Sequence, residues 1–301
     1  MTTANAGKYR GVFVAMNSCY DAYGEISTAA VKKNVRFLAD RGVAGVYVGG
    51  SSGEGFLQSV DERKRVLEAV MDEVGGELTV IAQVGAVSTK DSVDLAKHAH
   101  QANADAISSV PPFYYKVSEA AVEKHWLAMM DAAPLPFIIY HIPATTGFSL
   151  SLDLFRRLAS MEQVVGLKIT TASTYELQQF KRYGGDEFAV FNGPDEQYLA
   201  GRVMGADAGI GGTYGIMPEL FVGIEKAYVE GDLETARRRQ FAVNDIIADL
   251  LSVPVFGAIK EILKLRGLDC GGPRMPLEPV GAESMPKVRS IYEKIMRLVE
   301  A

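Results

Sequence analysis

Two side chains at the ends of apolar runs are of the types needed for covalent and proton-transfer chemistry. Lys168 ends the run 164–168, and Tyr140 ends the run 137–140. Desolvation disfavours the charged ammonium of a lysine, and the neutral amine can attack a ketone to form an imine. A phenol within hydrogen-bond reach of that imine can carry a proton to or from the reacting atoms. The alternatives are a lysine whose amine reaches water and a tyrosine that caps a core. The pairing of the two residues favours the chemistry.

A Gly- and Ser-rich segment offers a site for an anion. Residues 49–55 read GGSSGEG and lie between an apolar run and a helical pattern. The backbone N–H groups of such a segment, together with the hydroxyls of Ser51 and Ser52, suit a carboxylate. The segment matches neither the phosphate-binding GK[ST] loop nor GxGxxG. A turn without a ligand is an equally common interpretation of this composition.

Two adjacent carboxylates stand in a third segment. Residues 192–196 read NGPDE, so Asp195 and Glu196 could accept hydrogen bonds from a ligand with several hydroxyls. Acidic residues are also favoured at the start of a helix, which is the alternative interpretation. His98 and His100 are two residues apart in a helical pattern and face different sides, and the sequence contains no HExxH motif. We therefore predict no metal site.

These segments belong to a repeating pattern of apolar runs and amphipathic stretches. The runs lack strict polar alternation, which is typical of strands that are covered on both faces. The eight runs are residues 11–16, 45–48, 78–82, 106–110, 137–140, 164–168, 188–191 and 208–211.

The stretches between the runs carry helix-start signals. A Ser followed three residues later by a Glu predicts a capping box, and a lone Ser before an apolar pattern predicts a simple N-cap. The expected capping boxes are Ser59 with Glu62 and Ser173 with Glu176, and the expected N-caps are Ser118 and Ser151.

Strand and helix alternate at about 30 residues per unit, which with eight strands favours an α/β protein with a (β/α)₈ TIM barrel. A doubly wound open sheet is the main rival. In a barrel, the residues at the carboxyl ends of the strands converge on one site. Helical patterns at 236–251, 255–265 and 284–299 predict a C-terminal helical extension. We expect a catalytic barrel domain over residues 1–220 and a helical subdomain over residues 221–301.

Composition restricts the class of partner and the compartment. The chain has 301 residues, 48% of them hydrophobic, and a formal net charge of −6. An acidic chain does not suit a nucleic-acid partner, so a small molecule is expected. Cys19 and Cys270 are the only cysteines, which predicts reduced thiols. Neither a secretion signal nor a membrane-spanning run is evident. We expect a soluble cytoplasmic protein without a membrane partner.

Five motifs in order resemble those of the N-acetylneuraminate lyase and dihydrodipicolinate synthase superfamily of class I aldolases. The likeness runs from about Gly11 to the C-terminal helices. It implies a TIM barrel with a C-terminal helical domain, assembled as a homotetramer. The motifs are GGSSGE at 49–54, PFYY at 112–115, YHIP at 140–143, GLK at 166–168 and NGPDE at 192–196.

The resemblance assigns roles position by position. It makes Lys168 the Schiff-base lysine and Tyr140 the proton shuttle, with no cofactor beyond the covalent imine. Ser51 and Ser52 would hold the pyruvate carboxylate, and Tyr114 would complete a hydroxyl relay across a subunit interface. The residues that would line the sugar pocket are Thr170, Gly193, Asp195, Glu196, Ile210 and Gly212.

Within the superfamily, the motifs favour the sialic acid lyase branch. The synthases carry an arginine two residues after the proline of the YHIP-like motif, and this chain has Thr145 there. The lyase branch implies reversible cleavage of N-acetylneuraminate, a 2-oxo sugar acid, to pyruvate and N-acetylmannosamine. The alternatives are a 2-keto-3-deoxy sugar acid aldolase or dehydratase, a dihydrodipicolinate synthase, and a non-catalytic barrel that binds a 2-oxo acid.

Three departures from the branch pattern concern the barrel mouth. Gly212 stands where such lyases often have a serine that contacts the glycerol tail. Residues 17–20 (NSCY) replace a Thr-Pro-Phe signature, and His141 replaces the usual asparagine after the tyrosine. The lysine, the tyrosine and the Gly/Ser segment are intact.

Overall fold

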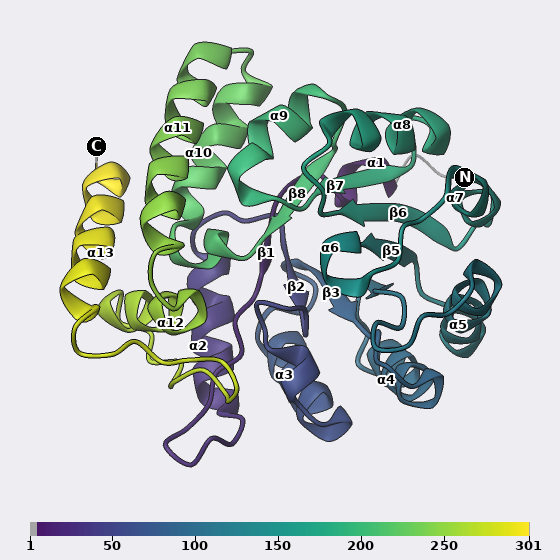
Figure 1. The fold of residues 1–301 in the computed structure, drawn as a ribbon, viewed down its shortest axis with the longest axis horizontal. Coiled ribbons are helices and arrows are strands. Elements are labelled where there is room, and N and C mark those ends of the chain that lie inside the picture. The colour runs from purple at the N-terminus through teal and green to yellow at the C-terminus, as the bar shows by residue number, and fades with distance from the viewer. Residues whose placement is uncertain (1–4, 301) are drawn as a thin grey trace.

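Eight parallel strands close into a barrel in a computed structural model that describes residues 5–300 (Figure 1). Each strand pairs with the next along the chain, and β8 pairs with β1. The strands are β1 Gly11–Ala15, β2 Gly45–Val48, β3 Thr79–Gln83, β4 Ala106–Ser109, β5 Phe137–His141, β6 Val164–Ile169, β7 Ala189–Asn192 and β8 Ala208–Gly211.

Helices surround the barrel and continue beyond it (Figure 1). The α-helices are α1 Asn5–Lys8, α2 Thr28–Ala39, α3 Val60–Val74, α4 Thr89–Gln101, α5 Glu119–Ala132, α6 Pro143–Thr146, α7 Leu152–Ala159, α8 Thr174–Gly184, α9 Tyr198–Val203, α10 Pro218–Val229, α11 Leu233–Leu250, α12 Val255–Leu265 and α13 Met285–Val299. Short 3₁₀ turns are η1 Gly55–Leu57, η2 Asp195–Gln197 and η3 Thr213–Ile216.

The closed topology confirms the TIM barrel and excludes the open-sheet rival. All eight apolar runs form strands, with bounds that differ from the expected ones by at most one residue at either end. The strands are buried almost throughout, because the barrel interior covers one face and the helices cover the other. This double burial is the physical reason for the absence of polar alternation.

Large side chains fill the barrel interior. The rings of Phe13 and Phe191 pack edge to face with centroids 5.4 Å apart, and Tyr9 closes the end of the barrel near the N-terminus against Phe191. Gly45 makes room for this packing, since a Cβ there would lie 2.4 Å from the ring of Phe13. The interior is therefore a solid core, and a ligand can enter only at its rim.

Serine caps position the helices as expected, with one exception. Ser59 and Glu62 form the full capping box at the start of α3. The Ser173 hydroxyl accepts from the Glu176 N–H at 3.0 Å, but the Glu176 carboxylate does not return to the cap. That carboxylate lies 3.2 Å from His141 Nε2 instead. The capping box predicted at Ser173 was therefore wrong in its second half, because a buried imidazole competes for the carboxylate.

The simple N-caps at α5 and α7 are confirmed. The Ser118 hydroxyl accepts from the N–H of Ala121 and the Ser151 hydroxyl from the N–H of Leu154, three residues on in each case. These two caps each satisfy a backbone N–H in the first turn of their helix.

His141 faces the surrounding helices and not the barrel interior. Its ring packs edge-on against Phe180 of α8, and burial lowers its pKa although Glu176 acts in the opposite direction. A histidine in place of the usual asparagine therefore affects the packing of β5 against α8.

The C-terminal helices pack on one side of the barrel. Figure 1 shows α12 and α13 beside α10, α11 and α2. The expected helices at 236–251, 255–265 and 284–299 correspond to α11, α12 and α13. Helix α10 spans the expected boundary at residue 220, and the division into two domains stays a prediction.

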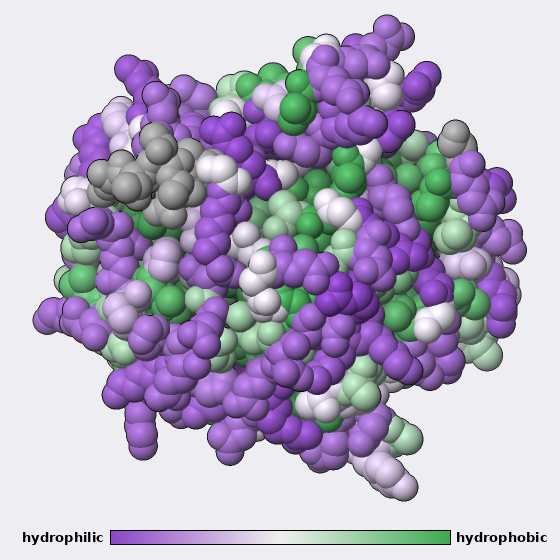
Figure 2. Space-filling model, turned by 180° about the vertical axis from the view of Figure 1, so that it is seen from behind, coloured by the Kyte–Doolittle hydropathy of each residue, from purple (hydrophilic) through white to green (hydrophobic). Residues whose placement is uncertain are grey.

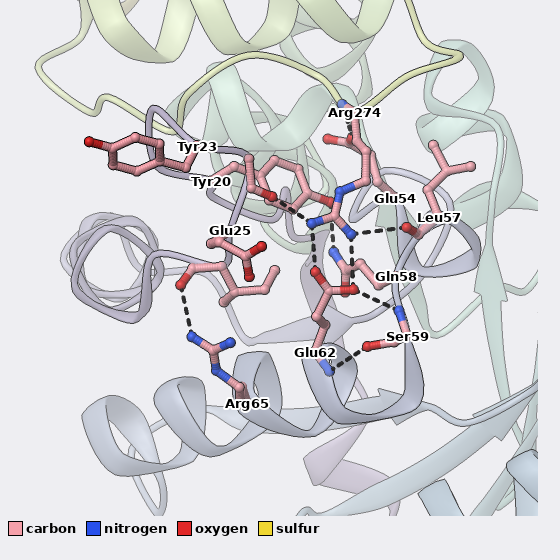
Figure 3. Close-up of polar contacts among 12 residues, drawn as sticks. Tyr20, Tyr23, Glu25, Glu54, Leu57, Gln58, Ser59, Glu62, Arg65 and Arg274 are labelled. Atoms are coloured by element: carbon pink, nitrogen blue, oxygen red, sulfur yellow. Dashed lines mark hydrogen bonds and ion pairs between the residues drawn. The ribbon is translucent and has the colours of Figure 1, made fainter.

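An arginine of the C-terminal segment ties that segment to the barrel (Figure 3). The Arg274 guanidinium donates to the Glu62 carboxylate at 2.6 and 3.0 Å and to the Leu57 carbonyl at 3.0 Å. Its backbone N–H donates to Glu54 Oε2 at 2.7 Å. These contacts reach the end of the Gly/Ser segment, so the C-terminal segment helps to fix that loop.

A buried ion pair makes a second connection at the same place. Lys260 Nζ of α12 lies 2.7 Å from Glu54 Oε1, with side-chain exposures of 2% and 0%. The same amine donates to the Gly272 carbonyl at 2.8 Å and lies 4.2 Å from the centre of the Tyr20 ring. The loop after β2 is thus anchored to residues more than 200 positions later in the chain.

Polar side chains cover most of one face of the molecule. Figure 2 shows a largely hydrophilic exterior on the rear face, with hydrophobic side chains gathered towards its middle. Among residues 5–300, no helix is long and apolar enough to cross a membrane.

Candidate active site

Lys168 and Tyr140 lie side by side at the carboxyl ends of β6 and β5. They are direct partners in the strand register, and Lys168 Nζ is 3.9 Å from the centre of the Tyr140 ring. The two residues are 5% and 3% exposed. The structure therefore places the amine beside the phenol ring, away from bulk water, and the alternative of an amine that extends into solvent does not hold.

A second tyrosine, not identified from the sequence, completes the surroundings of the amine. The centre of the Tyr47 ring lies 4.9 Å from Lys168 Nζ, and the Tyr47 and Tyr140 rings pack edge to face at 5.9 Å. The Tyr47 hydroxyl donates to Ser108 Oγ at 3.1 Å, and burial holds the pKa of this phenol well above its usual value. Tyr47 precedes the Gly/Ser segment by two residues. The alternation of side chains along a strand was the signal that could have placed its ring inside the barrel.

The Gly/Ser loop lies at the same end of the barrel. The Ser52 carbonyl accepts from Asn17 Nδ2 at 3.0 Å, which joins the loop to the segment after β1. The Ser51 carbonyl accepts from the N–H of Glu54 at 2.9 Å, and Ser51 itself is exposed. Glu54 has a φ of 55°, the left-handed conformation that a tight turn of the chain requires.

Gly212 faces Ser52 across the barrel mouth. A Cβ at position 212 would lie 2.4 Å from Ser52 Oγ, so a side chain there would displace the serine hydroxyl. The glycine that departs from the branch pattern therefore leaves room for the hydroxyl of the neighbouring loop. The structure brings Ser52 and Gly212 together as the prediction of a common pocket requires.

Asp195 is buried and already hydrogen-bonded. Its Oδ2 accepts from the Thr213 N–H at 2.7 Å and from the Thr213 hydroxyl at 2.6 Å. Burial raises the pKa of Asp195 to about 6, although the Thr213 bonds and the charge of Lys168 act in the opposite direction. Oδ1 borders Gly211, where a Cβ would lie 2.3 Å away.

This raised pKa predicts a pH-dependent stability. Because the folded-state pKa of about 6 exceeds the usual value of about 3.9, the folded state binds the proton more tightly than the unfolded state. Stability from this group is present below about pH 4 and is lost as the pH rises through about 6.

We expect the unfolding free energy of the wild type, relative to Asp195→Asn, to fall by about 2 kcal/mol between pH 4 and 7. Urea denaturation of both proteins across that range measures it. A pH-independent difference would contradict the assignment to Asp195.

The neighbouring Glu196 differs from Asp195 in its surroundings. Its side chain is exposed, and its backbone carbonyl accepts from Asn244 Nδ2 at 2.9 Å. The two acids begin the short turn η2, and α9 starts after them at Tyr198. Neither carboxylate caps α9, which weakens the helix-cap alternative.

Thr170 and Gly193 meet between the ends of β6 and β7. A Cβ at position 193 would lie 2.0 Å from Thr170 Oγ1, so only glycine allows this contact. Among residues 5–300, Thr170 Oγ1 has no hydrogen-bond partner although it is buried. A buried hydroxyl without a partner suits a ligand that supplies one.

Two predicted residues lie elsewhere in the single chain. The Tyr114 side chain is 78% exposed, and its ring contact is with Tyr115. Ile210 is 0% exposed, and its side chain belongs to the barrel-interior core. A relay through Tyr114 and a substrate contact at Ile210 stay predictions.

The arrangement combines the parts that imine chemistry needs. An amine shielded by aromatic rings lies beside a phenol, a loop rich in hydroxyl and N–H groups stands nearby, and acceptors for hydroxyl groups lie across the mouth. Among residues 5–300, no group of three or more His, Cys, Asp or Glu residues is placed to hold a metal ion.

Comparisons with known proteins agree with this arrangement. The model of the dihydrodipicolinate synthetase family matches residues 8–295. An N-acetylneuraminate lyase from Mediterraneibacter gnavus is 42% identical over 98% of this chain and 95% of its own length. One from Escherichia coli strain SMS-3-5 is 38% identical over 97% of this chain and 99% of its own. A sialic acid aldolase from Ruminococcus gnavus, solved as a catalytic lysine mutant, superposes with a TM-score of 0.95 at 42% identity, covering 97% of both chains. The chain belongs to the dihydrodipicolinate synthetase family.

Proposed function

We propose that this protein is a Schiff-base aldolase that cleaves N-acetylneuraminate reversibly to pyruvate and N-acetylmannosamine. The observation that carries the proposal is the buried amine of Lys168, 3.9 Å from the centre of the Tyr140 ring. The family and the N-acetylneuraminate lyase relatives support it, as does the Ruminococcus gnavus aldolase with its catalytic lysine.

The lysine supplies the electron sink. The neutral amine of Lys168 adds to the substrate ketone, and loss of water gives a protonated imine. As the C3–C4 bond breaks, its electron pair moves towards the iminium nitrogen and leaves an enamine. N-acetylmannosamine departs as the aldehyde. Protonation of the enamine at C3 and hydrolysis of the imine release pyruvate and restore the amine.

Tyr140 moves the proton in this scheme. The C4 hydroxyl must lose its proton as the aldehyde forms, and the Tyr140 oxygen takes that proton while the phenol's own proton passes to the substrate carboxylate. The Gly/Ser loop holds that carboxylate through Ser51 and Ser52. The rings of Tyr47 and Tyr140 border Lys168 Nζ and limit the access of water, which protects the imine from early hydrolysis.

The remaining groups at the mouth bind the sugar. Asp195 and Glu196 accept hydrogen bonds from hydroxyls, and the buried Thr170 hydroxyl without a partner supplies another contact. Tyr114 joins the relay from a second copy of the chain, because it is exposed in one copy. This role fits a homotetramer. We further propose a cytoplasmic location and catalysis without any cofactor beyond the imine.

A 2-keto-3-deoxy sugar acid is the second candidate substrate. Gly212 presents no hydroxyl where the lyase branch often has one, which weakens the contact with a long polyhydroxylated tail. The imine chemistry would be unchanged. Thr145, in place of an arginine, disfavours the synthase reaction.

A pyruvate-release assay coupled to lactate dehydrogenase tests the proposal. N-acetylneuraminate is compared with a panel of 2-keto-3-deoxy sugar acids at equal concentrations. The expected result is the highest kcat/KM for N-acetylneuraminate. A higher value for a shorter acid would replace the proposed substrate, and no pyruvate from any of them would remove the aldolase proposal.

A further inference from the structure

A small cavity lies behind the Gly/Ser loop, between α3, α4 and the ends of β2 and β3. Its volume is about 10 Å³, which is roughly the room that one water molecule needs. Apolar side chains form most of its wall, and three polar residues complete it: Arg63, Gln83 and His98. None of these residues has a part in the reaction described above.

Each of the three polar residues has one buried atom without a protein partner. Among residues 5–300, Arg63 Nε, Gln83 Nε2 and His98 Nδ1 make no hydrogen bond. Buried polar atoms are nearly always hydrogen-bonded, to protein or to ordered water. Three such atoms on residues that line one water-sized cavity indicate a shared ligand.

The bonds of the neighbouring atoms define what each of these atoms can offer. Gln83 Oε1 accepts from Arg63 Nη2 at 2.8 Å, so Gln83 Nε2 is the amide nitrogen and a donor. Arg63 Nε is a donor by its chemistry. His98 Nε2 lies 2.7 Å from Glu68 Oε1, so the ring donates from Nε2, and in the tautomer that carries this proton Nδ1 is an acceptor.

Two donors and one acceptor are complementary to a water molecule. Its oxygen accepts from Arg63 and Gln83, and one of its hydrogens is donated to His98 Nδ1. A halide would satisfy the two donors but would face the lone pair of the imidazole nitrogen. The cavity therefore suits water better than a monovalent anion.

Arg63 connects this cavity to the loop that carries the serines. Its Nη1 donates to the Gly85 carbonyl at 3.0 Å and its Nη2 to the Gln83 carbonyl at 2.6 Å, both at the end of β3. A Cβ on Gly49 would lie 3.8 Å from Arg63 Nε, and the Phe56 ring lies 6.0 Å from the guanidinium carbon. The side chain thus borders the loop at its start and just beyond its end.

Within the described part of the chain, no carboxylate accepts a hydrogen bond from this guanidinium. Its three bonds go to neutral oxygens. Burial lowers the pKa of Arg63 to about 10, so the group remains charged at neutral pH with all its donors available. A buried charge of this kind needs every hydrogen bond it can make, which includes the one at Nε.

We propose that the cavity binds one ordered water molecule, which accepts the remaining hydrogen bond of Arg63 at Nε. We further propose that Arg63 is a positioning residue, which holds the Gly/Ser loop in the conformation that binds the substrate carboxylate. The water closes a network that runs from His98 on α4 through Arg63 on α3 to the Gln83 and Gly85 carbonyls, with Gly49 beside the guanidinium. This role rests on the proposed aldolase function, whereas the water site does not.

Crystallography of the wild-type protein tests the water site directly. Crystals grown without halide should show a single peak within about 3.2 Å of Arg63 Nε, Gln83 Nε2 and His98 Nδ1. Crystals soaked in sodium bromide should show no anomalous signal at that position. An anomalous peak there would replace the water with an anion, and a well-ordered site without any peak would overturn the proposal.

Steady-state kinetics test the positioning role. His98→Leu removes the acceptor for the water, and we expect the KM for pyruvate in the synthesis direction to rise about tenfold while kcat changes less than about twofold. KM should rise without a change in kcat because weaker carboxylate binding destabilises the bound ground state and the transition state equally. His98→Asn places an amide oxygen near the position of Nδ1 and should restore most of the affinity.

Two control variants distinguish an effect of the cavity from a general loss of structure. Glu68→Gln removes the surface charge beside His98 but keeps an acceptor for Nε2, so its KM should match the wild type. His125→Leu alters another buried histidine, whose Nδ1 bonds to Thr89 at 2.8 Å, and should leave KM unchanged. An unchanged KM in His98→Leu, with active wild type, would remove the positioning role. A wild type without turnover would instead contradict the aldolase function and leave the crystallographic result to decide the water site.

Discussion

Lys168→Ala is expected to reduce turnover at least about 10⁴-fold while the unfolding free energy stays near that of the wild type. Without the amine, no imine forms, and the electrons of the breaking bond have no acceptor. Among residues 5–300, the side chain has no salt bridge or side-chain hydrogen bond that other residues depend on, and its close contacts are with the rings of Tyr140 and Tyr47. Pyruvate release and urea denaturation measure the two quantities.

Borohydride trapping gives the same experiment a chemical readout. Reduction in the presence of pyruvate should attach the three-carbon unit to Lys168 in the wild type and to no residue in Lys168→Ala. Tyr140→Phe is the matched variant, because it keeps the amine and the ring but loses the hydroxyl. It should still be trapped, with turnover lowered about 10²- to 10⁴-fold. A peptide map with an unmodified Lys168 would contradict the covalent mechanism.

Lys260→Met is expected to cost about 3–5 kcal/mol of stability, because it leaves a buried carboxylate without its countercharge. The Glu54 side chain is 0% exposed, and its Oε1 lies 2.7 Å from the lysine amine. The loss should be visible as a lower midpoint in urea denaturation with little change in the slope.

The double variant Glu54→Gln/Lys260→Met separates a buried charge from ordinary packing loss. Removal of both charges should recover a large part of the stability, since the uncompensated carboxylate is the main penalty. Oε2 also accepts from the backbone N–H of Arg274, and glutamine can keep that bond through its carbonyl oxygen. A double variant as unstable as the single one would show that the charge is not the cause.

The sequence predicted the fold well because its signals were local. Uninterrupted apolar runs with helix caps between them require strands covered on both faces, and eight such units leave few arrangements other than a closed barrel. The neighbouring positions of Lys168 and Tyr140 followed from the order of the strands. The failed half of the capping box at Ser173 has a non-local cause, since His141 on another strand competes for the Glu176 carboxylate.

The parts of the site that sequence reasoning missed depend on contacts between distant segments. Tyr47 becomes part of the surroundings of the amine only when β2 and β6 face each other across the barrel. The pairing of Asp195 with Thr213 joins the ends of β7 and β8. No spacing rule connects Glu54 with Lys260 or Arg274, because their proximity arises from the return of the C-terminal segment to the barrel mouth.

The return of the C-terminal segment to the barrel mouth affects when, during synthesis, the loop at Glu54 gains its partners. A ribosome releases the barrel strands first, yet the turn at Glu54 gains its partners only after Lys260 and Arg274 have emerged. A nascent chain that stops short of residue 260 would carry every reacting group but neither of these anchors of the loop. The anchoring of this loop therefore depends on a segment that emerges more than 200 residues after it.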